Sequence, residues 1–133
     1  MLGVDIGTSG VKNVPQNNSL LNESEKIRYV ASIDIGTNST HLLIAAVDTS
    51  LKTFTVEFAE KSTTRLGEKD LLTGELTQHA MERVLETLKR FKALAESHNV
   101  EDVLVAATSA VREAPNGGDF ISKVRTQIDL DVE

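Results

Sequence analysis

The sequence predicts an α/β fold in which helices pack on a mixed sheet, with the element order β-β-β-α-β-α-β. Three short apolar or alternating segments between residues 29 and 58 are separated by turn-forming residues, which is typical of an antiparallel meander. A segment with helical periodicity over residues 77–98 and a continuous apolar run over 103–107 follow. Because strand–helix–strand connections are right-handed crossovers, these elements extend the meander into a mixed sheet. The last element reaches the end of the chain, so we expect the fold to be incomplete at its C-terminus.

The first three strands are predicted from their side-chain patterns. Residues 29–35 interleave apolar with small or polar side chains, and residues 40–47 form a second apolar run. Between them, residues 36–39 have the composition of a turn. Residues 53–58 alternate polar and apolar side chains with a period of two, so we expect a half-buried third strand.

One long helix is predicted after a loop over residues 64–76, with Thr77 as its N-cap and Asn99 at its end. Its apolar side chains recur at spacings of three and four, as on one buried face: Ala80, Val84, Leu85, Leu88, Phe91, Leu94 and Ala95. The apolar run at 103–107 then predicts a strand covered on both faces. A second helix is expected over residues 120–127, followed by the start of another strand over 129–133.

Composition restricts the classes of function. The chain has no cysteine, which excludes disulfides and thiolate sites and leads us to expect a cytoplasmic location. A net charge of −6 disfavours binding to nucleic-acid backbone, so no nucleic-acid partner is expected. No apolar run is long enough for a membrane span and no secretory signal is recognisable, so no membrane association is expected. A polyanionic substrate would need local cations, backbone N–H groups or a metal ion.

The predicted domain occupies residues 28–133, and residues 1–27 are expected to form a loosely ordered or linker-like N-terminal extension. Residues 13–26 are polar and contain Pro15. Residues 4–12 resemble residues 33–41, but only the second copy leads into a long apolar strand. We therefore expect the second copy to be the working loop.

The turn after the first strand has the properties of a phosphate-binding loop. Gly36 allows the backbone to approach an anion closely, and successive N–H groups can form a nest. Thr37, Asn38 and Ser39 add short donors. Asp34, at the end of the strand, can hold a hydrated divalent cation through water. The alternative is an ordinary tight hairpin turn.

Two further groups of polar residues are candidates for phosphate binding. Thr108 and Ser109 follow the predicted buried strand, and ligands gather beyond the carboxyl ends of strands in open α/β sheets. Arg112 can bind a phosphate with two N–H groups. The alternative is helix capping by Thr108 or Ser109, with Arg112 on the surface. Arg65 can be a second phosphate clamp, the alternative being a solvated loop arginine.

Three segments of the chain resemble motifs of the exopolyphosphatase and guanosine pentaphosphate phosphohydrolase family: residues 31–44, 64–68 and 107–117, in that order. The resemblance covers about residues 29–133. It implies an actin-like fold of the ribonuclease-H type and magnesium-dependent release of terminal phosphate from polyphosphate or guanosine pentaphosphate. It also implies that Asn38 and Ser39 contact phosphate and that Arg112 approaches the substrate, with Arg65 as a further candidate.

The chain departs from this family's pattern after Asp129. The family's general-base glutamate lies in a Ser-Gly-x-Glu-Glu-Ala motif beyond the strand that begins there, and neither this motif nor the second glycine-rich phosphate loop is present. We therefore expect no catalytic residue within the chain, a general base after Glu133, and an inactive fragment. The alternatives are a fragment of an actin-like sugar or acetate kinase and a non-catalytic phosphate-binding or interaction module. Self-association through surface left open by truncation is a further prediction.

Overall fold

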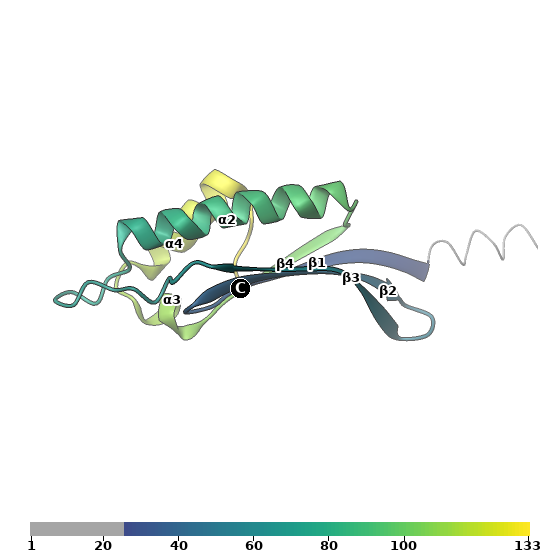
Figure 1. The fold of residues 1–133 in the computed structure, drawn as a ribbon, viewed down its shortest axis with the longest axis horizontal. Helices are drawn as coiled ribbons and strands as arrows, with labels where there is room; N and C mark the ends of the chain where they lie inside the picture. Colours follow the sequence, from purple (N-terminus) through teal and green to yellow (C-terminus); the bar gives the residue numbers. More distant parts are fainter. Residues whose placement is uncertain (1–25) are drawn as a thin grey trace, which may run out of the picture.

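The computed structural model describes residues 26–133 as a four-stranded sheet with helices packed against it (Figure 1). The strands are β1 (Ile27–Ile35), β2 (Ser39–Asp48), β3 (Thr53–Thr63) and β4 (Asp102–Ala107). Their order in the sheet is β3-β2-β1-β4; β1, β2 and β3 are antiparallel neighbours, and β4 is parallel to β1. The predicted meander and mixed sheet are confirmed. β3 extends beyond the predicted residues 53–58, and its residues 53–57 are exposed instead of half-buried.

The predicted N-terminal extension and the first copy of the loop fall almost entirely within residues 1–25, outside the described residues. β1 begins at Ile27, one residue before the predicted start of the domain.

The long helix α2 (Gln78–Ser97) has the predicted boundaries. Thr77 caps it, because its Oγ1 accepts a hydrogen bond from the N–H of Ala80 at 3.2 Å. After the helix, Asn99 adopts a left-handed conformation with φ of 55°, as residues that end helices often do. The remaining helical elements are α3 (Ser109–Glu113), α4 (Gly117–Lys123) and η2 (Val124–Ile128), a wider helical turn that continues α4.

The second predicted helix starts earlier than expected, at Gly117 instead of residue 120. Two glycines in succession, as at 117 and 118, are typical of loops. Gly117 instead permits close packing of α4 on α3, since a Cβ at this position would lie 1.8 Å from the carbonyl oxygen of Val111. Here a glycine marks a close contact between two helices and not a chain reversal.

A single core lies between the sheet and the helices. In β1 the buried side chains of Ala31, Ile33 and Ile35 alternate with exposed Ser32 and Asp34. The largest fully buried side chains come from all layers: Phe91, Phe120, Ile33, Ile35, Leu42, Ile44, Leu66, Leu88, Val84, Val105, Val111 and Val124. Each contributes about 1.5–3 kcal/mol by leaving water. This packing fixes β1 and β4 side by side.

The opposite face of the sheet has no covering element among residues 26–133, because α2 and α4 pack on the same side (Figure 1). Leu104 and Leu43 flank Ser32 in the strand register and are 56% and 37% exposed. The prediction that the strand at 103–107 is covered on both faces is therefore wrong: its apolar run is buried on one face only. The strand predicted over 129–133 is reduced to a single parallel bridge between Val132 and Val105.

Candidate functional site

The carboxyl ends of β1 and β4 meet at one edge of the sheet. Ile35 is the register partner of Ala107, and the N–H of Thr108 donates to the carbonyl oxygen of Ile35 at 3.0 Å. The turn that follows β1 and the segment that follows β4 therefore begin side by side. This is the edge at which open α/β sheets bind ligands.

The turn between β1 and β2 is closed by a hydrogen bond from the N–H of Gly36 to the carbonyl oxygen of Ser39, at 2.9 Å. A Cβ at position 36 would lie 2.7 Å from the same oxygen, so the turn requires glycine for this close approach. The N–H of Gly36 is thus used inside the turn, and the donors nearest to solvent are those of Thr37 and Asn38, both exposed.

The loop after β3 is bonded to this turn along its backbone. The N–H groups of Thr64 and Arg65 both donate to the carbonyl oxygen of Asn38, at 3.1 and 2.9 Å. The N–H of Gly67 donates to the carbonyl oxygen of Thr37 at 2.8 Å. Arg65 has a φ of 51°, a conformation that non-glycine residues rarely adopt. We call residues 36–39 and 64–67 together the turn–loop unit.

Two buried groups anchor the turn–loop unit to the core. The hydroxyls of Thr40 and Thr64 lie 2.9 Å apart, and both residues are fully buried, so each hydroxyl satisfies the other. Leu66, on the same loop, is 0% exposed. Arg65 and Glu68, which precede and follow Leu66, are exposed at the surface.

Thr37, Asn38, Arg65, Gly67 and Glu68 line a pocket of about 260 Å³ beside the unit. Arg65 is 66% exposed, and its Nε lies 3.7 Å from Oε1 of Glu68, which makes a weak ion pair. The second carboxylate oxygen of Glu68 lies 3.1 Å from Nη2 of Arg83. The guanidinium of Arg65 is therefore accessible at the pocket.

The segment after β4 carries the remaining candidates. Oγ1 of Thr108 is buried and has no hydrogen-bond partner within the described part of the chain, and Thr108 does not cap α3 with its side chain. Nη1 of Arg112 donates to the carbonyl oxygen of Ala107 at 3.1 Å, which turns the side chain back over the end of β4. An arginine has several further donors, so this hydrogen bond leaves N–H groups for a ligand. Ser109 is exposed at the start of α3.

The structure thus brings all the predicted phosphate-binding residues to one edge of the sheet, in two neighbouring places. Thr37, Asn38 and Arg65 share the pocket, whereas Thr108, Ser109 and Arg112 do not line it. The helix-capping alternative for Thr108 is not what the structure has. Its buried hydroxyl has no partner among the described residues and belongs to the residue whose N–H bonds the last residue of β1.

Asp34, the predicted metal ligand, is exposed on the uncovered face of the sheet and pairs in register with His41 and Ala106. Residues 26–133 contain no group of three or more His, Asp or Glu side chains that could hold a metal ion. A single carboxylate cannot complete the coordination of a metal ion. It is compatible with Mg²⁺ bound to a phosphate substrate, because Mg²⁺ is commonly coordinated by one or two carboxylates, substrate oxygens and water.

Two residues that support the site were not found from the sequence. The side-chain amide of Asn116 pairs with the backbone of Leu76, accepting from its N–H at 2.8 Å and donating to its carbonyl oxygen at 3.0 Å. Nε of Arg83 donates to the carbonyl oxygen of Thr64 at 2.8 Å. The partners are far away in the sequence, so no local pattern indicates either contact.

Similarity to known proteins agrees with this arrangement. Residues 43–133 match the model of the Ppx/GppA phosphatase family. The chain is 36% identical over 99 residues to a bifunctional 3-dehydroquinate synthase/phosphatase of Fusobacterium nucleatum, covering 71% of this chain and 15% of the relative. It is 30% identical over 101 residues to exopolyphosphatase 1 of Mycobacterium tuberculosis, covering 76% of this chain and 29% of the relative.

Solved structures of family members have the same fold. A Ppx/GppA family member from Aquifex aeolicus superposes with a TM-score of 0.75 at 36% identity, covering 80% of this chain and 34% of the other. An exopolyphosphatase from Cytophaga hutchinsonii gives 0.73 at 35% identity, covering 80% and 33%. These neighbours place the mixed sheet and its helices in the actin-like fold. The chain spans about a third or less of the length of the relatives it matches. It belongs to the Ppx/GppA phosphatase family.

Proposed function

We propose that residues 26–133 provide phosphate-binding elements of a phosphohydrolase that releases terminal phosphate from polyphosphate or guanosine pentaphosphate. The turn–loop unit, which lies at the same sheet edge as the unpartnered hydroxyl of Thr108, is the observation that carries this proposal. Relatives named exopolyphosphatase support it. The family assignment favours a phosphohydrolase over the sugar or acetate kinase considered as an alternative.

Phosphate chains carry charge that this acidic protein repels at long range, so binding depends on local donors. Arg65 and Arg112 are two cations at the edge that have N–H groups left for a ligand, and a guanidinium matches the geometry of phosphate oxygens. Asn38 and Ser39 add donors from the turn, and Thr108 adds its hydroxyl. Two arginines on different elements suit an elongated chain of phosphates better than a single orthophosphate.

Asp34 is the residue that would hold Mg²⁺, through water, once a phosphate chain is bound. The ion would neutralise charge on the phosphate oxygens and polarise them. Asp34 contributes one carboxylate, so we propose that the ion binds together with the phosphate chain and not before it.

We propose that the general base is supplied from outside residues 26–133. Glu68, the carboxylate that lines the pocket, is paired with two arginines and is poorly placed to accept a proton from water. Positioned proton transfer contributes about 10²–10⁴-fold to such reactions. The purified chain is expected to release no phosphate from polyphosphate in the presence of Mg²⁺ beyond the uncatalysed rate. Steady release at rates typical of an enzyme would contradict this part of the proposal.

Calorimetric titration with tripolyphosphate and Mg²⁺ tests the binding function. We expect the chain to bind, and Arg112→Met to weaken binding by about tenfold or more, since a charge-assisted hydrogen bond contributes about 1.5–3 kcal/mol. Arg125→Met is the matched control, because Arg125 lies on η2 and pairs with Asp129 and Asp131. Absence of binding at millimolar ligand, or equal losses in the two variants, would contradict the proposal. Binding by this chain without hydrolysis by any longer form would favour the non-catalytic module.

We also propose a cytoplasmic location and no nucleic-acid partner. The absence of cysteine suits the reducing cytoplasm, and the negative charge disfavours nucleic acid. No helix formed by residues 26–133 has the length and apolar character needed to cross a membrane.

Self-association of this chain is proposed to involve the uncovered sheet face, where Leu104, Val56 and Phe54 are 56%, 49% and 61% exposed. The proposal concerns pairing with a second copy of the chain. Light scattering on a size-exclusion column tests it. A strictly monomeric chain at high concentration would count against it.

A further inference from the structure

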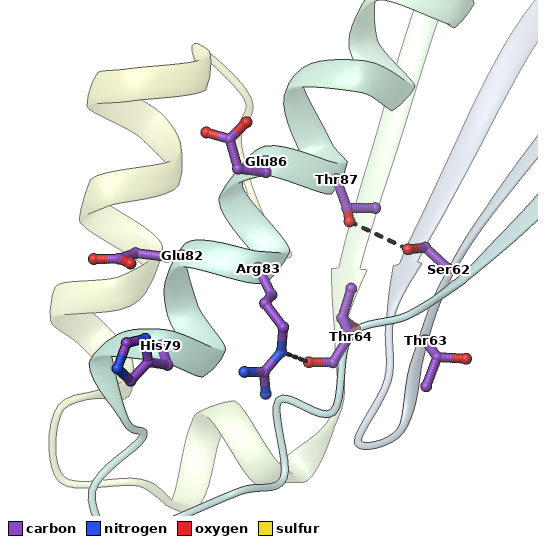
Figure 2. Close-up of a pocket in the computed structure, with 8 residues that line it drawn as sticks. All are labelled: Ser62, Thr63, Thr64, His79, Glu82, Arg83, Glu86 and Thr87. Atoms are coloured by element: carbon purple, nitrogen blue, oxygen red, sulfur yellow. Dashed lines mark hydrogen bonds between the residues drawn. The ribbon is translucent and has the colours of Figure 1, made fainter.

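Arg83 lies in the N-terminal half of α2, and its guanidinium reaches the loop after β3. Its Nε donates to the carbonyl oxygen of Thr64 at 2.8 Å, and its Nη2 donates to that of Arg65 at 3.3 Å. Nη2 also lies 3.1 Å from Oε2 of Glu68. Figure 2 shows Arg83 and Thr87 reaching from the helix toward the strand and loop, while Glu82 leads away from them. One side chain thus holds three acceptors of the same loop.

These contacts fix one peptide unit from both sides. The peptide between Thr64 and Arg65 donates its N–H to the carbonyl oxygen of Asn38, and its own carbonyl oxygen accepts from Arg83. Asn38 belongs to the proposed phosphate turn. Arg83 is therefore linked to that turn through a single peptide, which is hydrogen-bonded to both. It lies on another element and does not line the pocket.

The held peptide leads into a residue with an unfavourable backbone conformation. Arg65 has a φ of 51°, and a left-handed conformation costs a non-glycine residue about 1–2 kcal/mol. Hydrogen bonds on both sides of the preceding peptide oppose its relaxation. The direction of the Arg65 side chain depends on this backbone, because a rotation at φ moves the Cβ and with it the side chain that lines the pocket.

Arg83 also acts on the charge of the pocket. Glu68 lines the pocket and has two cationic neighbours, Arg83 at 3.1 Å and Arg65 at 3.7 Å. The closer pairing with Arg83 draws the carboxylate away from Arg65. Without Arg83, Glu68 would pair with Arg65 alone and would oppose an incoming phosphate.

Packing alone does not hold the guanidinium of Arg83 in place. It borders an open pocket of about 540 Å³, lined by Ser62, Thr63, Thr64, His79, Glu82, Arg83, Glu86 and Thr87 (Figure 2). The side chain is 35% exposed, so it has room to adopt other rotamers. Its orientation therefore depends on its hydrogen bonds, which use the planar fork that a lysine lacks.

We infer that Arg83 is a positioning residue for the phosphate site: it holds the Thr64–Arg65 peptide and Glu68 so that Arg65 stays directed at the pocket. This inference rests on the proposed function of the site. Arg83 itself does not touch the phosphate chain.

Amide hydrogen exchange and tripolyphosphate titration of three variants test this role. Arg83→Met removes the fork, Arg83→Lys keeps the charge without the fork, and Arg90→Met is the matched control on the same helix. Arg90 pairs with Glu60 of β3 and forms no hydrogen bond or ion pair with the turn–loop unit. Exchange at core amides of β1 reports global stability in each protein.

In the absence of ligand, Arg83→Met is expected to accelerate exchange at the amides of Arg65 and Gly67 by about tenfold relative to the core, as expected when hydrogen bonds to charged groups are lost. Tripolyphosphate affinity should fall by a similar factor, with Arg83→Lys intermediate in both measurements. Arg90→Met should change neither the exchange of these amides relative to the core nor the affinity for tripolyphosphate. Unaltered loop exchange and affinity in Arg83→Met, or equal effects in Arg90→Met, would overturn the inference.

The two measurements separate this inference from the proposed function. If the wild-type chain binds no tripolyphosphate, the proposed function fails, and exchange alone shows whether Arg83 holds the turn–loop unit. If Arg83→Met does not fold, Arg83→Lys carries the test, because it preserves the helix and the charge. Wild-type exchange and affinity in Arg83→Lys would then count against the role of the guanidinium fork.

Discussion

The turn–loop unit and the segment after β4 begin at the same sheet edge but are fixed in different ways. In the unit, the carbonyl oxygens of Thr37 and Asn38 accept three backbone N–H groups, so its shape is set by main-chain hydrogen bonds. After β4, Arg112 makes one hydrogen bond to a strand end and the hydroxyl of Thr108 has no partner in the described residues. Changes in the first region should therefore affect stability and binding together, whereas side-chain changes in the second should affect binding alone.

The largest expected effect concerns the support beneath the second region. Gly117→Ala would place a Cβ 1.8 Å from the carbonyl oxygen of Val111, so α4 must move away from α3. We expect a loss of about 3 kcal/mol in the free energy of unfolding, at the upper end for overpacking. Gly118→Ala is the control, because a Cβ there has no neighbour within 4 Å. Urea denaturation that gives equal stabilities for the two variants would contradict the close contact.

A smaller effect is expected in the turn–loop unit. Gly67→Ala would place a Cβ 2.4 Å from Cγ2 of Thr37. We expect a loss of about 1–2 kcal/mol, because a side-chain methyl group can yield more easily than backbone. Thr37→Ser removes that methyl group, so the double variant should regain most of the loss. A double-mutant cycle with no coupling energy would show that these residues do not meet.

Arg112→Met tests the segment after β4, where a side-chain change should affect binding and not stability. Its exposed side chain makes one hydrogen bond to Ala107, so we expect the free energy of unfolding to fall by no more than about 0.5 kcal/mol. The same variant is expected to lose most of its affinity for tripolyphosphate. A large loss of stability in thermal denaturation would mean that Arg112 holds the fold instead of the ligand.

The smallest effect depends on pH. The backbone N–H groups of Thr73 and Leu72 donate to the carboxylate of Asp70 and lower the pKa of Asp70 below its ordinary value. A carboxyl group with a lowered pKa stabilises the fold above its unfolded pKa of about 3.9, and that contribution is lost as the pH falls through the folded pKa.

Asp70→Asn should therefore be slightly less stable than the wild type near neutral pH. The difference should begin to shrink as the pH falls below about 4 and vanish only below the lowered pKa of the folded state. Urea midpoints measured across this range check the prediction, and a difference that is the same at both ends would contradict it.

Local patterns in the sequence were enough to predict most of the fold. The strands follow from alternation and apolar runs, and the cap at Thr77 depends on a partner three residues away. The coverage of Leu104 was not predictable, because an apolar run looks the same whether one face is packed or both. The start of α4 was misplaced because Gly117 looks like a loop residue when its neighbour Val111 is unknown.

The placement of the candidate residues was predictable where polar residues follow strand ends, whereas their role in phosphate binding stays a prediction. Asn38, Arg65, Thr108 and Arg112 were all named from motifs, and the structure brings them to one edge. Arg83 and Asn116 were missed because their hydrogen bonds join residues 19 and 40 positions apart. Such contacts depend on how α2 and α4 pack against the loop over residues 64–76, which no local pattern specifies.

The central claim is that both regions of the edge bind one phosphate chain. Amide chemical shifts recorded by NMR during titration with tripolyphosphate and Mg²⁺ test it most directly, with sulfate as the control anion. We predict saturable shifts at Thr37, Asn38 and Arg65 and, with the same affinity, at Thr108 and Ser109. Shifts confined to one of the two regions, or spread over other basic surfaces and reproduced by sulfate, would contradict the claim.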